Sequence, residues 1–243
     1  MVIENMKKNL LGNMKKSDKR NIIGTFVFLF YFFATELQAL PFWILGINTE
    51  TLPMIVKVIY TIFFQVGLIS VIAYVFRKDL KRDLKDLKKN HESYFKEYLK
   101  YWFIALGLMM VSNLIIIMLN SGDIANNEEL IREMFDETPI YTFISAVLIA
   151  PLLEELVFRK SFRYMFNNDT LFIIMSGLVF GAFHVIGSFE TAFDLIYIIP
   201  YSIPGLVFAY TLVKSKNIFV PIGLHFLHNG ILMSLQFLLM FFS

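Results

Sequence analysis

Long apolar runs, separated by short charged segments, constrain the fold of this chain more than any other feature of its sequence. About seven runs of roughly 18 to 25 residues are long enough to cross a bilayer as helices. They begin near Ile22, Leu52, Tyr101, Ile140, Leu171, Asp194 and Ile218. With 57% hydrophobic residues over 243 positions, the chain is too apolar for a soluble domain. We therefore predict an all-α, polytopic helical membrane protein.

Charge is distributed unevenly among the segments that separate the apolar runs. Lysine and arginine are concentrated in residues 1–20, 77–100, 159–163 and 214–216. Acidic residues are concentrated in residues 120–139. Because cytoplasmic loops carry an excess of Lys and Arg, a cytoplasmic N-terminus places all the basic segments on the cytoplasmic side. Residues 1–20 are therefore predicted to be a basic cytoplasmic segment, and residues 21–243 a single transmembrane domain.

The charged segment 77–100, between the second and third apolar runs, admits two interpretations. Leu80, Leu84 and Leu87 recur at helical spacing among lysines. Such a segment can lie on the inner leaflet as an amphipathic helix. Alternatively, it is a solvated charged helix that links two spans.

Two adjacent carboxylates and an arginine interrupt the fourth apolar run. On a helix, Glu155 and Arg159 are about 40° apart, whereas Glu154 and Arg159 are about 140° apart. We therefore expect Glu155 to pair with Arg159 and Glu154 to remain free. Pro151 removes one helical hydrogen bond, and the resulting kink can open the helix to a cavity. A charge within the membrane is by default a functional hypothesis, although a cytoplasmic helix end anchored by Arg159 is the alternative.

Three of the four histidines lie in apolar runs. The run that carries His184 contains Gly177, Gly181, Ala182 and Gly187, small residues that permit close helix approach. His225 and Asn229 are four residues apart and share one helix face, whereas His228 lies on the flank of that face. For His228 alone, an interhelical hydrogen bond is the favoured interpretation.

These side chains suit the hydrolysis of an amide by water. Glu154 can deprotonate a water held with His184. His225 and Asn229 can donate to the tetrahedral oxyanion, a contribution of about 3 to 4 kcal/mol for a well-placed donor. Glu154, His184 and His225 would also suit zinc, although the H-E-x-x-H motif is absent. We favour a reaction without a metal or another cofactor. The chain has no cysteine, which excludes thiolate chemistry.

Three motifs follow one another on the late apolar runs. They are Glu154-Glu155-x-x-x-Arg159, Phe180-x-x-x-His184 and His225-x-x-x-Asn229. This ordered set resembles the CPBP (Abi) family of intramembrane proteases, which includes the type II CAAX prenyl endopeptidases. The resemblance covers residues 140–243, the predicted CPBP-like catalytic core, and implies an active-site cavity between the late helices.

The resemblance also implies roles for the motif residues. Glu154 and His184 would activate the water, and His225 with Asn229 would form the oxyanion site. The supporting residues would be Glu155 and Arg159. The family has been described both as metalloproteases and as glutamic proteases, so the choice between zinc and metal-free catalysis stays open.

The sequence thus predicts an intramembrane endopeptidase of a bacterial cytoplasmic membrane. Bacterial relatives suggest bacteriocin or pheromone maturation, or self-immunity. The expected partners are the lipid bilayer and a membrane peptide or protein substrate, with no nucleic acid. The alternative is a non-catalytic membrane immunity or scaffold protein that regulates a sensor kinase, a role that requires a membrane protein partner. A transporter is less favoured because the chain shows no internal repeat.

Overall fold

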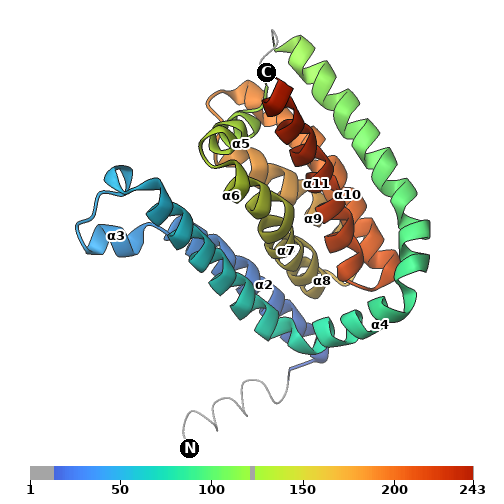
Figure 1. The fold of residues 1–243 in the computed structure, drawn as a ribbon. Coiled ribbons are helices and arrows are strands. Elements are labelled where there is room, and N and C mark those ends of the chain that lie inside the picture. Colours follow the sequence, from blue (N-terminus) through green and yellow to red (C-terminus); the bar gives the residue numbers. More distant parts are fainter. Residues whose placement is uncertain (1–13, 121–123, 243) are drawn as a thin grey trace, which may run out of the picture.

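The computed structural model describes residues 14–120 and 124–242, and these residues form helices and no strands (Figure 1). The helices are α2 (Lys16–Glu36), α3 (Leu40–Ile44), η1 (Thr49–Thr51), α4 (Met54–Leu119), α5 (Asn126–Glu137), α6 (Pro139–Ile144), η2 (Ser145–Ile149), α7 (Ala150–Glu154), η3 (Glu155–Ser161), α8 (Phe162–Met165), α9 (Asp169–Ile186), η4 (Ala192–Tyr197), α10 (Ile198–Ser215) and α11 (Phe219–Phe242).

The helical membrane fold predicted from the apolar runs is confirmed. Among the described residues, 4 helical stretches are long and apolar enough to cross a membrane: Met54–Leu119, Pro139–Met165, Asp169–Ile186 and Ala192–Ser215. The count of seven spans and the cytoplasmic N-terminus stay predictions. Most of the basic segment 1–20 lies outside the described residues.

Helix α4 contains both apolar runs that begin near Leu52 and Tyr101, together with the charged segment between them. It is one continuous helix of 66 residues that bends at the charged segment 77–100, so that a first arm (residues 54–76) and a second arm (residues 101–119) lie on either side of the bend (Figure 1). We call this charged segment the bridge. The bridge contains neither Gly nor Pro, so nothing in its sequence interrupts the helix. The first arm shares a hydrophobic cluster with α2, and the second arm packs against α10 and α11.

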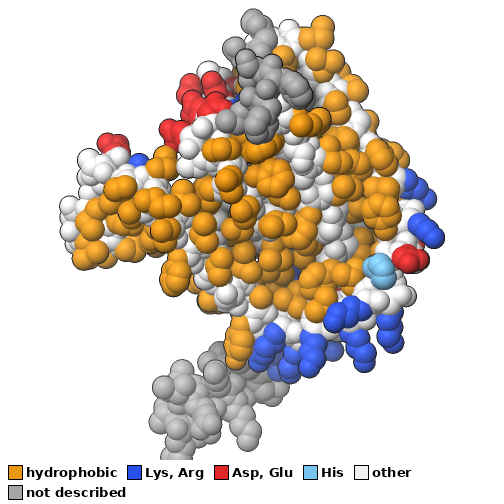
Figure 2. Space-filling model, viewed as in Figure 1, with side chains coloured by type: hydrophobic (Ala, Val, Ile, Leu, Met, Phe, Trp, Pro, Cys, Tyr) orange, Lys and Arg blue, Asp and Glu red, His pale blue; other side chains and the backbone are white. Residues whose placement is uncertain are grey.

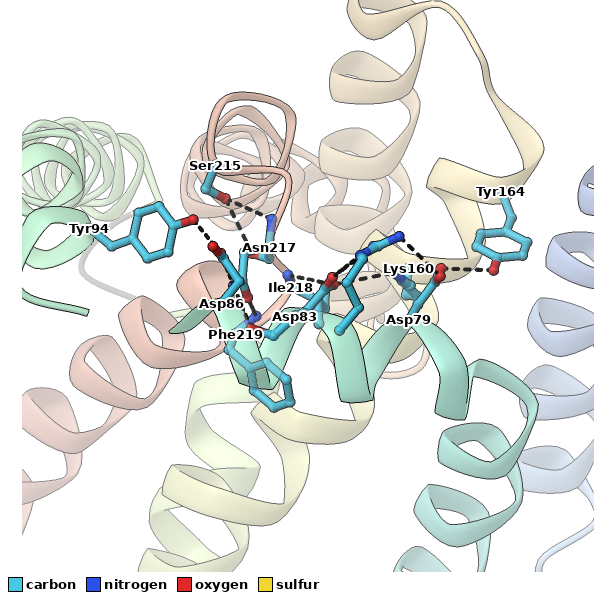
Figure 3. A network of polar contacts seen from close by, with 11 residues as sticks. Asp79, Asp83, Asp86, Tyr94, Lys160, Tyr164, Ser215, Asn217, Ile218 and Phe219 are labelled. Atoms are coloured by element: carbon cyan, nitrogen blue, oxygen red, sulfur yellow. Dashed lines mark hydrogen bonds and ion pairs between the residues drawn. The ribbon is translucent and has the colours of Figure 1, made fainter. Parts of the chain in front are cut away.

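One face of the bridge docks onto the helical core through Asp79, Asp83 and Asp86 (Figure 3). Lys160 Nζ lies 3.0 Å from Asp79 Oδ2 and 3.5 Å from Asp83 Oδ2. Asn217 Nδ2, in the turn between α10 and α11, donates to Asp86 Oδ2 at 2.8 Å. Asp83, at the centre of this face, is 2% exposed, so its carboxylate is buried in the protein interior. Neither interpretation of the segment anticipated this docking.

The surface of the molecule is divided by charge (Figure 2). Lysine and arginine side chains line the bend of α4, which we call the basic end. Acidic side chains gather at the opposite end, over α5, which we call the acidic end. Between the two ends the surface is largely hydrophobic, as expected for the part of a protein that contacts lipid.

Helices α9 and α10 approach closely because α9 presents glycines to α10. A Cβ atom added at Gly181 would lie 2.8 Å from the carbonyl oxygen of Ile198, and one at Gly177 would lie 2.6 Å from Leu206. The predicted role in close helix packing is confirmed for Gly177 and Gly181 but is wrong for Gly187, where an added Cβ would meet nothing within 4 Å. Phe158 fills the space beside α9, with its ring 5.6 Å from that of Phe180 and 5.2 Å from that of Phe183. This packing fixes the position of His184, one turn further along α9.

Candidate active site

One cavity of about 380 Å³ brings the predicted site residues together. It is bounded by the second arm of α4 and by α5, η2, α7, α9, α10 and α11. Glu154, His184, His225 and Asn229 all line it, although they come from three separate apolar runs. Its size is that of a typical ligand-binding pocket. The supporting residues Glu155 and Arg159 lie behind its wall.

The two adjacent glutamates have different surroundings. The Glu154 side chain is 19% exposed and faces the cavity, with Oε2 3.7 Å from His225 Nε2. Glu155 is fully buried, with Oε2 3.2 Å from Arg159 Nε. The predicted pairing of Glu155 with Arg159 is confirmed. The distance of 3.7 Å is too long for a direct hydrogen bond, but it brings the Glu154 carboxylate within ion-pair distance of the His225 ring.

Arg159 is held within the protein by ionic and aromatic contacts. Its guanidinium carbon lies 4.2 Å from the ring centre of Phe180 and 5.6 Å from that of Phe208. Its Nη2 donates to the carbonyl oxygen of Gly205 at 3.4 Å. With an exposure of 0%, Arg159 does not anchor a helix end in the headgroup region. It connects η3 to α9 and α10, and so supports the wall behind Glu154.

The orientation of the His225 ring is set by Glu155. His225 Nδ1 lies 2.9 Å from Glu155 Oε1. Since Glu155 is also paired with Arg159, its carboxylate accepts this hydrogen bond and Nδ1 donates it. Only Nε2 is then directed towards Glu154 and the cavity. His225 can therefore donate a hydrogen bond into the cavity only when its ring is protonated.

The orientation of His184 is set by the backbone of α9. Its Nδ1 lies 2.8 Å from the carbonyl oxygen of Phe180, one turn earlier. A carbonyl oxygen only accepts, so Nδ1 carries the hydrogen and neutral His184 keeps Nε2 as an acceptor. The imidazole also stacks on Tyr201 of α10, with ring centres 5.0 Å apart. These contacts leave Nε2 as the nitrogen that can hold a water.

Asn229 compensates for an irregularity of the facing helix. In the π-helical segment η2, the Ala150 N–H donates to the carbonyl oxygen of Ser145, five residues earlier. In the same spacing, the donor to Ala146 would be residue 151, which is a proline and has no N–H. Asn229 Nδ2 donates to the Ala146 oxygen at 2.8 Å. One hydrogen of the amide is thus used, and the other is available to the cavity.

The cavity includes residues to which the sequence assigned no role. Met109, Met110 and Asn113 come from the second arm of α4, and Asn127, Glu128, Ile131 and Arg132 come from α5. The acidic segment 120–139 was considered only as a charged connection. Its signal was an amphipathic pattern, in which Phe135 is fully buried. His228 also lines the cavity and is 5% exposed, with no hydrogen bond to its Nδ1 among the described residues.

The zinc alternative requires Glu154, His184 and His225 to converge on one point. In the part of the chain that the structure describes, no group of three His, Asp or Glu side chains is placed to hold a metal ion. The Nδ1 contacts of His184 and His225 leave both Nε2 atoms open to the cavity, which suits a water or a metal equally. Because the three side chains do not form a ligand set as they stand, the reaction proposed for this site uses no metal. That the reaction proceeds without a metal stays a prediction.

The fold and the site together define a class: a multi-pass helical membrane protein with carboxylate, imidazole and amide groups around an internal cavity. Comparison with known families extends this assignment. Residues 136–231 match the family described as type II CAAX prenyl endopeptidase Rce1-like. This segment contains all three motifs, and the match supports the similarity of this chain to the CPBP family. The resemblance stated from the motifs is confirmed.

Individual relatives are bacterial proteins, and two of them are named as membrane proteins. The chain is 27% identical over 118 residues to the putative membrane peptidase YdiL of Bacillus subtilis, covering 47% of this chain and 45% of that one. It is 29% identical over 158 residues to the membrane-embedded CAAX protease MroQ of Staphylococcus aureus, covering 59% and 60%. It is 33% identical over 178 residues to an uncharacterized protein of Mycoplasma capricolum, covering 65% and 50%.

The chain therefore spans about half the length of the curated relatives it matches. No solved structure matches it. The similarity and the apolar helices identify a multi-pass membrane protein of the bacterial cell membrane.

Proposed function

We propose that this chain is a membrane-embedded endopeptidase that hydrolyses a peptide bond in a membrane-associated peptide or protein. The observation that carries the proposal is the convergence of Glu154, His184, His225 and Asn229 on one cavity within the segment that matches the protease family. Two relatives, named as a putative membrane peptidase and a CAAX protease, support the same function.

In the proposed reaction, Glu154 is the general base. Its carboxylate faces the cavity and accepts a proton from a water that His184 holds through Nε2. The water oxygen bonds to the carbonyl carbon of the substrate and forms a tetrahedral intermediate. When the C–N bond breaks, Glu154 returns the proton to the leaving amine. No covalent intermediate with the enzyme is needed.

Asn229 and His225 are the proposed donors to the oxyanion. Asn229 retains one amide hydrogen for the cavity, and protonated His225 donates through Nε2. In that form Glu154, Glu155, Arg159 and His225 carry no net charge together. A neutral cluster avoids the free energy that a net charge in the membrane would require. Glu155 orients His225, and Arg159 holds Glu155.

The experiment compares membrane peptides from bacteria that express the wild-type chain, Glu154→Gln or His184→Ala. We expect peptides cleaved only with the wild type, and a loss of processing of at least about 100-fold in each variant. Bacteriocin and pheromone precursors are the first candidates to examine. Glu129→Gln is the matched control, because Glu129 is exposed on α5 and does not line the cavity.

Full processing by both variants would contradict the proposed reaction. If immunity or the regulation of a sensor kinase also persisted in these variants, the chain would act as a non-catalytic membrane partner. Correct insertion of each variant is checked by its yield in the membrane fraction.

A further inference from the structure

The cavity extends well beyond the reacting groups. On α11 it is lined at His225, Asn229, Leu232, Met233 and Gln236, which follow one face of the helix. At 1.5 Å per residue, this face is about 16 Å long. An extended peptide covers that length with about five residues. The part of the cavity between Asn229 and the acidic end, which we call the amide arm, has no role in the reaction described above.

Side-chain amides distinguish the amide arm from an ordinary gap between membrane helices. Asn113 of α4, Asn127 of α5 and Gln236 of α11 all face it. Among the described residues, Asn113 and Gln236 make no hydrogen bond, and Asn127 makes only a long one of 3.4 Å to Tyr201 Oη. An amide offers two donors and one acceptor oxygen, so these groups retain most of their hydrogen-bonding capacity.

A peptide that has left the helical conformation needs hydrogen-bonding partners for its backbone, and side-chain amides can supply them. A membrane peptide must leave the helical conformation before a water can attack its carbonyl, and this exposes backbone N–H and C=O groups. In hydrocarbon each unsatisfied group costs several kcal/mol. Side-chain amides pair with both kinds of backbone group, and they do so whatever the substrate sequence. The walls between them include Met109, Met110 and Met233, flexible side chains that adapt to different residues.

The two ends of the cavity differ in their access to water. Glu155 and Arg159 close the basic end, with side chains that are 0% exposed. At the acidic end, Glu128 and Arg132 line the cavity and their side chains are 37% and 48% exposed. Helix α5 is held there by Asn126 Nδ2, which donates to the carbonyl oxygen of Ser188 at 2.9 Å. The exposed part of the cavity lining therefore lies on the α5 side.

We propose that the amide arm binds an unwound segment of about five residues of a membrane peptide, which enters beside α5 and pairs its backbone with Asn113, Asn127 and Gln236. This inference rests on the proposed protease function and assigns its substrate-binding groove. It predicts little sequence specificity along this stretch, because the amides contact the backbone.

The first experiment measures binding separately from cleavage. The probe is an apolar peptide of about 20 residues with a photoreactive diazirine side chain at its centre. It is cross-linked to the purified full chain carrying Glu154→Gln, so that no turnover occurs. We expect adducts on α5 and on the 232–236 stretch of α11. Adding Asn113→Leu and Gln236→Leu should weaken binding about tenfold. Gln65→Leu, on the first arm of α4 and outside the cavity, should leave it unchanged.

The second experiment tests the side of entry, using the absence of cysteine from the chain. Single variants Met233→Cys, Glu133→Cys and Lys85→Cys are reconstituted in sealed vesicles and treated with a membrane-impermeant thiol reagent. We expect Met233→Cys to react from the same side as Glu133→Cys, at the acidic end, and opposite to Lys85→Cys on the bridge.

The outcomes separate the groove from the catalytic proposal. Adducts confined to the lipid-facing surface, or reaction of Met233→Cys from the Lys85 side, would overturn the amide arm as a groove even if the wild type cleaves peptides. Adducts in the arm together with side-specific labelling would support the groove even if no cleavage were found.

Discussion

Glu155 orients His225: its Oε1 lies 2.9 Å from the imidazole Nδ1, while its Oε2 faces Arg159 at 3.2 Å. The carboxylate that does not face the cavity thus determines which nitrogen of His225 does. Adjacent glutamates on one helix have separate tasks, because neighbouring side chains point about 100° apart. Glu154 reaches the cavity, and Glu155 reaches the helices behind it.

The two glutamates should respond differently to substitution. Glu155→Ala leaves Arg159 buried without its partner, and we expect a loss of about 3 to 5 kcal/mol of stability. Glu154→Gln should change stability by about 1 kcal/mol or less while abolishing processing. Thermal unfolding in detergent and peptide processing measure the two effects. A double variant, Glu155→Met with Arg159→Met, should be more stable than Glu155→Ala. Equal destabilisation by the two glutamate variants would contradict this division.

Asn229 should affect both stability and rate. Asn229→Ala leaves the Ala146 carbonyl without a donor, at a cost of about 1 to 3 kcal/mol, and removes a proposed oxyanion donor, at a cost of about 10² to 10³ in rate. Pro151→Ala supplies a backbone N–H in the same helix. Combined with Asn229→Ala, it should restore stability without restoring activity. Strictly additive stability effects in this double-mutant cycle would show that Asn229 does not compensate for Pro151.

The close approach of α9 and α10 should not tolerate a methyl group. A Cβ at Gly181 would lie 2.8 Å from the Ile198 carbonyl oxygen, so Gly181→Ala should destabilise by about 1 to 3 kcal/mol. The matched control is Gly187→Ala at the end of the same helix, where a Cβ would meet nothing within 4 Å. Thermal unfolding of both variants in detergent provides the comparison. If the two behaved alike, the glycine packing of α9 would not determine stability.

The contact between Tyr94 and Asp86 should depend on pH at both extremes. Hydrogen bonds from Tyr94 and Asn217 hold the pKa of Asp86 below its ordinary value. Burial, together with Asp86, raises the pKa of Tyr94 to about 12. Because the pKa of Asp86 is lower in the folded protein, ionised Asp86 stabilises the fold above about pH 4. This stabilisation is lost as the pH falls through the pKa of the folded state. Because the pKa of Tyr94 is higher in the folded protein, the neutral Tyr94 hydroxyl stabilises the fold below about pH 10. This stabilisation is lost as the pH rises through the pKa of the folded state.

The measurement is the difference in thermal unfolding midpoint between the wild type and Tyr94→Phe in detergent, from about pH 3 to 11. We expect the wild type to be more stable by a constant amount over the middle of this range, with a smaller difference towards either end. Asn90→Ala, which removes another hydrogen bond that lowers the pKa of Asp86, should show the same loss of its effect towards the acidic end. A difference that does not vary with pH would contradict the assignment of these titrations.

Local features of the structure followed from the sequence. Apolar runs of sufficient length gave helices, and the four-residue spacing of Glu155 and Arg159 gave their ion pair, even though η3 is π-helical there. The glycines of α9 predicted close packing correctly at Gly177 and Gly181, because a residue without a Cβ lets a neighbouring helix approach at that point. The four residues with predicted catalytic roles line one cavity, because their helices bring the motif-bearing faces together. Their roles stay predictions.

Features that depend on tertiary contacts could not be predicted from the sequence. The contact of His225 with Glu155 joins residues 70 positions apart, and no spacing rule predicts it. The aspartates at 79, 83 and 86 did share one helix face in the sequence, but the surrounding lysines suggested a solvated or lipid-facing helix. Their partners Lys160 and Asn217 become apparent only once the helices are packed.

The uninterrupted helix of α4 has a consequence for how this chain can change its length. The aspartates of the bridge contact their partners only if they point in the present direction about the helix axis while both arms stay packed on the core. Inserting one residue between the bridge and an arm would turn that arm by about 100°. Inserting seven would leave only about 20° of rotation. We therefore expect relatives with a longer segment to differ by seven residues, or two helical turns, because this insertion keeps the aspartates facing the same side of the helix.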